Sequence, residues 1–147
     1  MRVYLSGEIH TNWRDQIITA CADLNVTFDG PVTDHVASDD CGVLILGTEA
    51  DKFWHDHKGA QLNAIRTRNG IEQADIIVVR FGDKYKQWNA AFDAGYAAAL
   101  GKSLIVMHGP DNQHALKEVD AAALVVAETP QQVAAALRYV LTSVVPT

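Results

Sequence analysis

The sequence predicts a single α/β domain of the doubly wound kind, in which helices cover both faces of a mostly parallel sheet of about five strands. Three observations carry this prediction. Short apolar runs alternate with longer segments of helical spacing along the chain. Two of these runs, 76–79 and 103–107, are almost entirely apolar, as strands covered on both faces are. The runs end at glycine, proline or polar residues, which favour turns.

Length and composition agree with one globular domain that spans 1–147. The chain has 147 residues, of which 48% are hydrophobic and 20% are charged. Its net charge of −6 argues against nucleic acid and against an anionic membrane surface as main partners. We find neither a signal peptide nor an apolar run of the roughly 20 residues that span a bilayer. Cys21 and Cys41 lack CxxC spacing, so we expect a reducing, cytoplasmic location.

The chain begins with a buried strand and an amphipathic helix. Residues 2–6 are β-branched, aromatic or small, and Gly7 closes the strand with a tight turn. Apolar residues then recur at helical spacing over 13–24. Thr11 or Asn12 is expected to cap that helix, because either side chain can accept a bond from a free backbone N–H.

The next stretch is harder to read. A brief strand is expected at 26–28, before a turn with glycine and proline. Residues 31–57 are rich in Asp and His, and we interpret them as an irregular excursion that contains at most a short strand at 43–46. Helical spacing returns over 58–73.

The second half has the clearest signals. A central strand at 76–79 is followed by an alanine-rich helix at 88–100, which Gly101 caps. Another buried strand is expected at 103–107. The remaining elements are a short helix at 112–118, a strand at 124–126 and a helix to about Leu141 that starts with a Thr129 cap and a proline.

Five strands joined by helices fit a flavodoxin-like or Rossmann-like three-layer sandwich. In such sheets ligands bind beyond the carboxyl ends of the strands, near the point where the strand order reverses. That rule points to the loops after Leu5, Val79 and Val106, and the first of these is Ser6 to Asn12. Gly7 lets a ligand approach the backbone, while Glu8 and His10 would project to the same side of an extended loop. The plain alternative is an ordinary turn with solvated polar residues.

A second candidate feature is the helix at 88–100. Asn89 and Asp93 are four residues apart and therefore share one face. Asp93 is the only acid between Asp83 and Asp111, and its helix is otherwise largely apolar. Such a carboxylate is either functional or a structural group that caps, pairs or faces water.

These residues also carry a family resemblance. The run 92–97, followed by Leu100-Gly101-Lys102 and an apolar strand, resembles the nucleophile helix of nucleoside 2-deoxyribosyltransferases. Residues 74–79 are similar to the strand that precedes this helix in the transferases. Residues 3–7 are similar to the first strand of that family with its glycine turn. Over essentially its full length the chain resembles the YtoQ family of the nucleoside 2-deoxyribosyltransferase-like superfamily, chiefly through 7–10 and 87–102.

The resemblance implies a reaction. In the transferases, the acid that matches Asp93 attacks the anomeric carbon and forms a covalent glycosyl-enzyme, from which water or a second base takes the sugar. This implies an N-glycosidic bond hydrolase or transferase acting on a nucleoside- or nucleotide-like small molecule. The chain departs from this pattern at two positions. The transferases have Glu where this chain has Asp93, and they have an acid where this chain has Thr67. This chain also has Glu8 where phosphate-binding relatives have Ser. These departures favour an alternative, a non-catalytic protein that binds a nucleotide- or sugar-like ligand.

The expected site combines both lines of reasoning. We expect catalytic roles for Asp93, Glu8 and His10. Substrate contacts are expected from six further residues: Tyr4, Ser6, Gly7, Arg80, Trp88 and Asn89. The His and Asp residues within 34–57 lack the spacing of a metal site, so we expect neither a metal nor a cofactor. Four aromatic residues that we expect to be exposed in loops predict a homodimer or higher homo-oligomer: Trp54, Phe81, Tyr85 and Trp88. Phe53 or Trp54 could also stack on a base.

Overall fold

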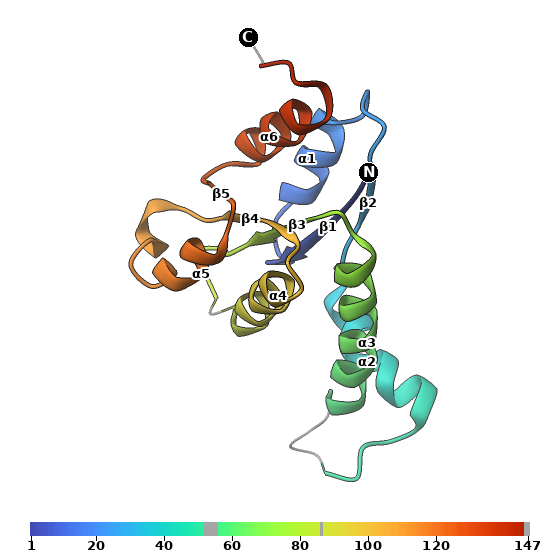
Figure 1. The fold of residues 1–147 in the computed structure, drawn as a ribbon. Coiled ribbons are helices and arrows are strands. Elements are labelled where there is room, and N and C mark those ends of the chain that lie inside the picture. Colours follow the sequence, from blue (N-terminus) through green and yellow to red (C-terminus); the bar gives the residue numbers. More distant parts are fainter. Residues whose placement is uncertain (52–55, 86, 146–147) are drawn as a thin grey trace.

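The computed structural model describes residues 1–51, 56–85 and 87–145, and it has three layers (Figure 1). Five parallel strands form one sheet in the order β2-β1-β3-β4-β5. This confirms the predicted flavodoxin-like topology. The strands are β1 (Arg2–Gly7), β2 (Thr27–Asp29), β3 (Ile76–Arg80), β4 (Ser103–Met107) and β5 (Val125–Ala127).

Helices connect these strands and cover both faces of the sheet (Figure 1). One face packs against α1 and α6, and the other against α3, α4 and α5. No described helix combines the length and the apolar character needed to cross a membrane. The helical elements are α1 (Trp13–Ala20), α2 (His35–Leu46), α3 (His57–Gln73), α4 (Trp88–Ala99), the 3₁₀ turn η2 (Pro110–Asn112), α5 (Lys117–Ala122) and α6 (Pro130–Thr142).

The strand pleat decides which side chains reach the site. Successive residues of a strand point to opposite faces. Val3 and Leu5 of β1 are buried with α1 and α6, whereas Tyr4 is buried with α3 and α4. Ser6 therefore projects toward α4, and the end of β1 presents a hydroxyl to that helix.

The expectation for 31–57 is wrong in part, because 35–46 form a regular helix. Asp34 caps α2 by accepting a hydrogen bond of 2.7 Å from the backbone N–H of Ala37. The apolar run 43–46, expected as a short strand, is the last turn of this helix. A short apolar run has no periodicity that separates a strand from a helix, and the cap decides here for the helix.

Two further local predictions need correction. The side chains of Thr11 and Asn12 do not cap α1: Asn12 occupies the N-cap position without a side-chain cap bond, and the Thr11 hydroxyl binds Glu8. The short helix expected at 112–118 is divided into η2 and α5. The predicted Thr129 cap of α6 is confirmed, and Gln132 completes a reciprocal capping box.

The helices α2 and α3 form a hairpin that extends away from the sheet (Figure 1). Their backbones touch at two glycines. A Cβ atom added to Gly42 would lie 2.1 Å from the nitrogen of Gly59, and one added to Gly59 would lie 2.6 Å from the carbonyl oxygen of Asp39. The hairpin therefore depends on the absence of side chains at these positions.

Candidate active site

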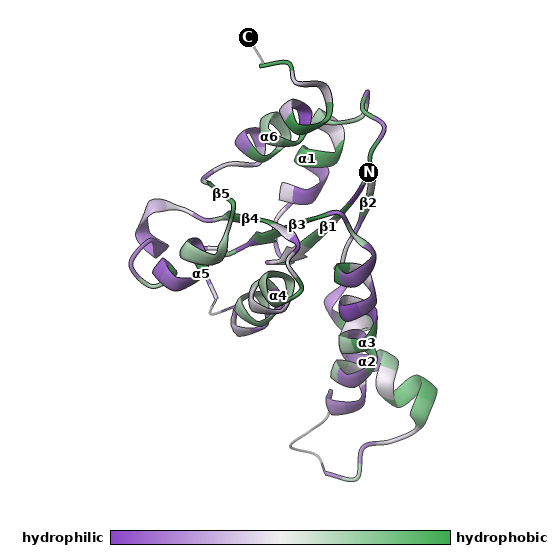
Figure 2. Ribbon diagram, in the orientation of Figure 1, coloured by the Kyte–Doolittle hydropathy of each residue, from purple (hydrophilic) through white to green (hydrophobic). Residues whose placement is uncertain are grey.

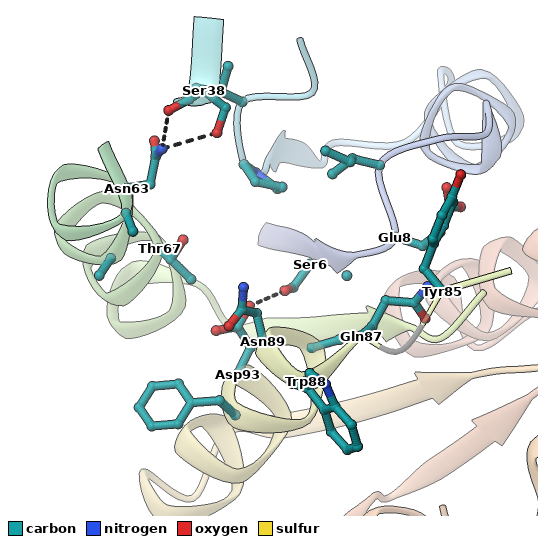
Figure 3. A pocket seen from close by; sticks show the side chains of 18 of the residues that line it. Ser6, Glu8, Ser38, Asn63, Thr67, Tyr85, Gln87, Trp88, Asn89 and Asp93 are labelled. Carbon is teal, nitrogen blue, oxygen red and sulfur yellow. Dashed lines mark hydrogen bonds between the residues drawn. The ribbon is translucent and has the colours of Figure 1, made fainter. Parts of the chain in front are cut away.

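A hollow of about 520 Å³ lies beyond the carboxyl end of β1. Helix α4 and the glycine turn form one wall, and α2 and α3 form the other (Figure 3). The hollow is next to the point where the strand order reverses, because β1 pairs with β2 on one side and with β3 on the other. This is where the fold rule locates ligands in open α/β sheets.

Ser6 and Asp93 meet at this hollow (Figure 3). The Ser6 hydroxyl donates a hydrogen bond of 2.5 Å to Oδ2 of Asp93, which joins β1 to α4. Ser6 is buried and Asp93 is half-buried. Burial raises the pKa of the Asp93 carboxyl above its ordinary value, and the hydrogen bond from Ser6 opposes part of that rise. The arrangement holds a carboxylate in place and makes it more basic than a solvated one.

Two other predicted residues on α4 line the same hollow. Asn89 lies one turn before Asp93 on the helix, so the amide and the carboxyl share a face (Figure 3). Trp88 begins the helix and is 73% exposed. An amide beside a carboxylate offers both a donor and an acceptor to a hydroxylated ligand.

Gly7 shapes the floor of the hollow. Its φ is +103°, and an added Cβ would lie 2.1 Å from the carbonyl oxygen of Arg80. Gly7 is paired with Arg80 in the parallel register of β1 and β3, so the two strands end at the same level. Only glycine combines this backbone conformation with such a close approach.

The Glu8 carboxylate is bound by groups of its own loop and lies beside Arg80. It accepts hydrogen bonds from the backbone N–H of His10 and from the Thr11 hydroxyl at 2.7 Å, and Arg80 Nε lies 3.6 Å away. Burial acts to raise the pKa of Glu8, but these donors outweigh it and the pKa lies below the ordinary value. The Glu8 side chain is only 4% exposed, which leaves little of the carboxylate for a ligand.

Arg14 fixes this loop through its backbone carbonyls, a role that was not predicted from sequence. Its guanidinium donates to the carbonyl oxygens of Leu5 at 2.9 Å, Glu8 at 2.6 Å and Gly7 at 3.1 Å. Burial lowers the pKa of Arg14 to about 10. Trp13 adds a bond from its indole N–H to the Glu8 carbonyl at 2.8 Å. The glycine turn is thus held on its inner side by two residues of α1.

The remaining predicted residues lie apart from Asp93. The ring of His10 packs against Tyr85 with a centroid distance of 4.6 Å, at the side of the hollow opposite to Thr67 (Figure 3). Tyr4 is buried below the hollow, where its hydroxyl is 3.5 Å from that of Thr67. Arg80 faces Glu8 and is not among the lining residues.

Several lining residues were not predicted, and a large group of them belongs to α2 and α3. Asn63 donates to the carbonyl oxygen of Ser38 at 3.0 Å and to its hydroxyl at 3.1 Å, which ties the two helices together (Figure 3). Ala60, Ala64 and Thr67 continue the same face of α3. Their spacing of four and three residues is a signal of one helix face that the sequence did contain.

Gln87 was also missed. It occupies the N-cap position of α4 and lines the hollow. The Gly82 backbone N–H donates to its Oε1 at 2.7 Å, which fixes the orientation of the amide. Its Nε2 is buried and has no hydrogen-bond partner among the described residues. A buried donor without a partner is unfavourable by about 1–3 kcal/mol, so a ligand oxygen would improve its environment.

The other expectations have mixed outcomes. Phe81 is buried in the core rather than exposed, whereas Tyr85 and Trp88 are exposed. Phe53 and Trp54 lie outside the described residues. In the described part of the chain, no group of three or more His, Cys, Asp or Glu residues could hold a metal ion.

Comparisons with known proteins agree with the fold and the motifs. The YtoQ protein of Bacillus subtilis (strain 168) is 42% identical over 139 residues, which cover 93% of this chain and 94% of that protein. A solved structure of the 2-deoxyribosyltransferase from Bacillus psychrosaccharolyticus shares the fold with a TM-score of 0.54 and 15% identity, over 91% of this chain and 90% of that one. The Clostridium botulinum CMP N-glycosidase BcmB is more distant, with a TM-score of 0.49 and 14% identity, over 96% of this chain and 100% of that one.

The family assignment rests on sequence over almost the whole chain. A family model described as nucleoside 2-deoxyribosyltransferase YtoQ matches residues 4–141, which include most of β1, Asp93 and α6 except its last residue. The identity to the Bacillus subtilis protein extends over a similar share of both chains. The chain is therefore a member of the nucleoside 2-deoxyribosyltransferase YtoQ family.

Proposed function

We propose that this protein cleaves or transfers the N-glycosidic bond of a nucleoside-like small molecule, with Asp93 as the nucleophile. The observation that carries the proposal is a half-buried carboxyl group that Ser6 holds at a hollow beyond β1. A volume of about 520 Å³ is in the range of small-molecule sites. Membership of a family named for nucleoside 2-deoxyribosyltransfer supports the same chemistry.

The reaction would follow the two-step pattern of retaining glycosyl transfer. The carboxylate of Asp93 attacks the anomeric carbon, the bond to the base breaks, and a glycosyl ester forms. Water or a second base then attacks the same carbon and releases the carboxylate. Ser6 binds Oδ2 of Asp93, which holds this oxygen in place and leaves Oδ1 to react.

The neighbouring amides suit the sugar. Asn89 shares the helix face of Asp93, and Gln87 has a buried donor without a partner among the described residues. Both are expected to bind hydroxyl or ring oxygens of the sugar. His10 and Trp88 are expected to contact the base from the mouth of the hollow, where both line it. Tyr4 would act from below through Thr67, and Arg80 would act through Glu8.

A binding protein without turnover is the second candidate. It is favoured by the α3 wall, where the groups that face the hollow include the amide of Asn63, the methyl of Ala64 and the hydroxyl of Thr67. None of these side chains is an acid that could assist a departing base. In this reading the protein would hold a nucleotide- or sugar-like ligand intact.

A panel of nucleosides separates the two candidates. The protein is incubated with ribo- and deoxyribonucleosides and their 5′-phosphates, and free base is quantified by chromatography against Asp93→Ala. Base release above that variant supports the enzyme. If all ligands are recovered intact while one of them raises the melting temperature, the protein binds without turnover.

We also propose that copies of the chain associate and that the protein works in the cytoplasm. The last turn of α2 is apolar and exposed at the far end of the hairpin, with Leu44 81% and Ile45 69% exposed (Figure 2). A second copy would bury this turn, and Leu44→Asp would shift the protein toward a monomer in light-scattering measurements. The two cysteines, Cys21 and Cys41, are free thiols, which suits a reducing compartment.

A further inference from the structure

The hollow carries more negative than positive groups. Four carboxyl groups and one guanidinium are among its described lining residues: Glu8, Asp39, Asp56, Asp93 and Arg68. Arg80 offsets Glu8 from outside the lining, and Nδ1 of His35, also outside it, lies 2.9 Å from the Asp39 carboxylate. The two remaining acids, Asp39 on α2 and Asp56 at the start of α3, lie on the wall opposite to α4. A pocket with this balance repels phosphate and attracts a cation.

Among the described residues, the part of α3 next to Tyr4 presents no proton donor suited to a departing base. The Tyr4 hydroxyl is 3.5 Å from that of Thr67, below the hollow. Thr67 and Asn63 line the hollow on α3, and neither an aliphatic hydroxyl nor an amide is a useful general acid. A neutral base leaves poorly without a proton, since its nitrogen would depart as an anion.

From these two observations we propose that the substrate carries a positively charged base, as in an N-alkylated purine or a pyridinium nucleoside. This inference rests on the proposed function and narrows it to a class of substrates. The charge of the base would interact with Asp39 and Asp56, and the same charge would make the base a leaving group that needs no proton.

The steps balance without an added acid. Oδ1 of Asp93 forms a bond to the anomeric carbon as the bond from that carbon to the ring nitrogen breaks. The electron pair goes to the nitrogen and neutralises its positive charge, so the base departs neutral. Water then attacks the anomeric carbon, the ester bond returns its electron pair to Asp93, and the proton of the attacking water goes to solvent.

His10 also lines the hollow and could protonate a base, but its position argues against that role. Its ring contacts Tyr85 at 4.6 Å and lies 6.4 Å from the ring of His35, both measured between centroids. In Figure 3 Tyr85 lies at the right of the view, apart from the Ser6–Asp93 pair near its centre. We therefore expect His10→Gln to reduce turnover of a cationic nucleoside by less than about tenfold, well below the effect of losing a general acid.

The test compares 7-methylguanosine with guanosine, and the 2′-deoxy forms of both, at a pH where the methylated base is cationic. Base release is measured by chromatography, and each kcat/KM is divided by the uncatalysed rate of the same nucleoside in buffer. We expect this ratio to be at least about tenfold higher for the methylated member. In the double variant Asp39→Asn/Asp56→Asn the preference should fall severalfold, while Asp111→Asn, outside the hollow, should leave it unchanged.

The outcomes separate the inference from the proposed function. If guanosine is cleaved as efficiently as 7-methylguanosine, each relative to its uncatalysed rate, the inference is overturned and the proposed function stands. If the natural protein releases base from neither nucleoside faster than Asp93→Asn does, the proposed function fails. Tighter binding of 7-methylguanosine than of guanosine, measured by calorimetry, would in that case still support a cationic ligand. Equal binding of the two would overturn the cationic ligand as well.

Discussion

The two walls of the hollow are held together in different ways. The β1–α4 wall is fixed by hydrogen bonds from side chains, with Ser6 bound to Asp93 and Arg14 bound to three carbonyl oxygens of the first strand and loop. The α2–α3 wall combines direct contact of two backbones at Gly42 and Gly59 with two side chains of α3, the Asn63 amide bound to Ser38 and the Lys58 ammonium bound to the carbonyl oxygens at the end of α2.

This difference separates two tasks. The wall that is anchored in the sheet carries the carboxyl group that would do the chemistry, where a displacement of about 1 Å is expected to reduce the rate substantially. The wall that extends from the sheet carries polar and acidic groups that would select the ligand. Substitutions in the anchored wall should therefore act on kcat, and substitutions in the extended wall on KM.

Removal of the carboxylate gives the largest expected effect. Asp93→Asn should lower kcat/KM at least about 1,000-fold, because an amide does not form the glycosyl ester. The same variant should be more stable at neutral pH. The folded pKa of Asp93 lies above the unfolded one, so stability contributed by its protonated form is lost as the pH rises between them.

Denaturant unfolding checks the second half of that prediction. The stability advantage of Asp93→Asn over the natural protein should be present at neutral pH and should shrink as the pH falls from the raised folded pKa of Asp93 to its unfolded pKa, below which it should change no further. Equal stability of the two proteins at every pH would show that burial does not disfavour the charged form of Asp93.

Next in size is a change in the glycine turn. Gly7→Ala should lower the free energy of unfolding by about 3 kcal/mol or more, since a Cβ would overlap the Arg80 carbonyl and the backbone has a positive φ. Gly95→Ala is the matched control. It lies on α4 with nothing within 4 Å of an added Cβ, and it should stabilise the helix by up to about 1 kcal/mol.

A smaller effect is expected for Ser6, which holds the proposed nucleophile. Ser6→Ala should lower kcat/KM by about tenfold. Loss of the hydrogen bond removes the group that opposes the burial of Asp93, so the pKa of Asp93 should rise further. The acidic limb of the pH profile of kcat/KM should therefore move to higher pH. An unchanged limb would mean that Ser6 does not act through the carboxyl group.

The smallest effect tests the extended wall. Asn63→Ala removes two hydrogen bonds to Ser38 and should lower the free energy of unfolding by about 1 kcal/mol. Because the bond joins the hairpin that carries the ligand-selecting groups, KM should rise while kcat changes little. A variant with reduced kcat and the natural KM would contradict the division of tasks between the walls.

Much of the anchored wall could be predicted from sequence, because its signals are local. The strand at 76–79, the alanine-rich helix and the Thr129 cap are each visible in a few adjacent residues, and strand order followed from the alternation of elements. Ser6 and Asp93 are far apart in the chain but lie near the ends of elements that the fold brings to one edge of the sheet.

The extended wall could not be predicted in the same way. The helix α2 has its apolar residues in the last turn, mostly exposed, so its sequence lacks the periodic face of a core helix. Its position depends on contact between Gly42 and Gly59, which are distant in sequence. The inward turn of Glu8 was missed because it depends on donors that only the folded loop supplies.

The hydrogen bond from Ser6 would also make the proposed catalysis depend on correct strand pairing. Side chains alternate along β1, so a slip of one position would present Leu5 or Gly7 to the helix in place of the hydroxyl. A misaligned molecule could retain its helices and its compact shape yet leave the acid unrestrained. In a refolding experiment, recovered turnover would therefore report on the alignment of the innermost strands, which circular dichroism does not distinguish.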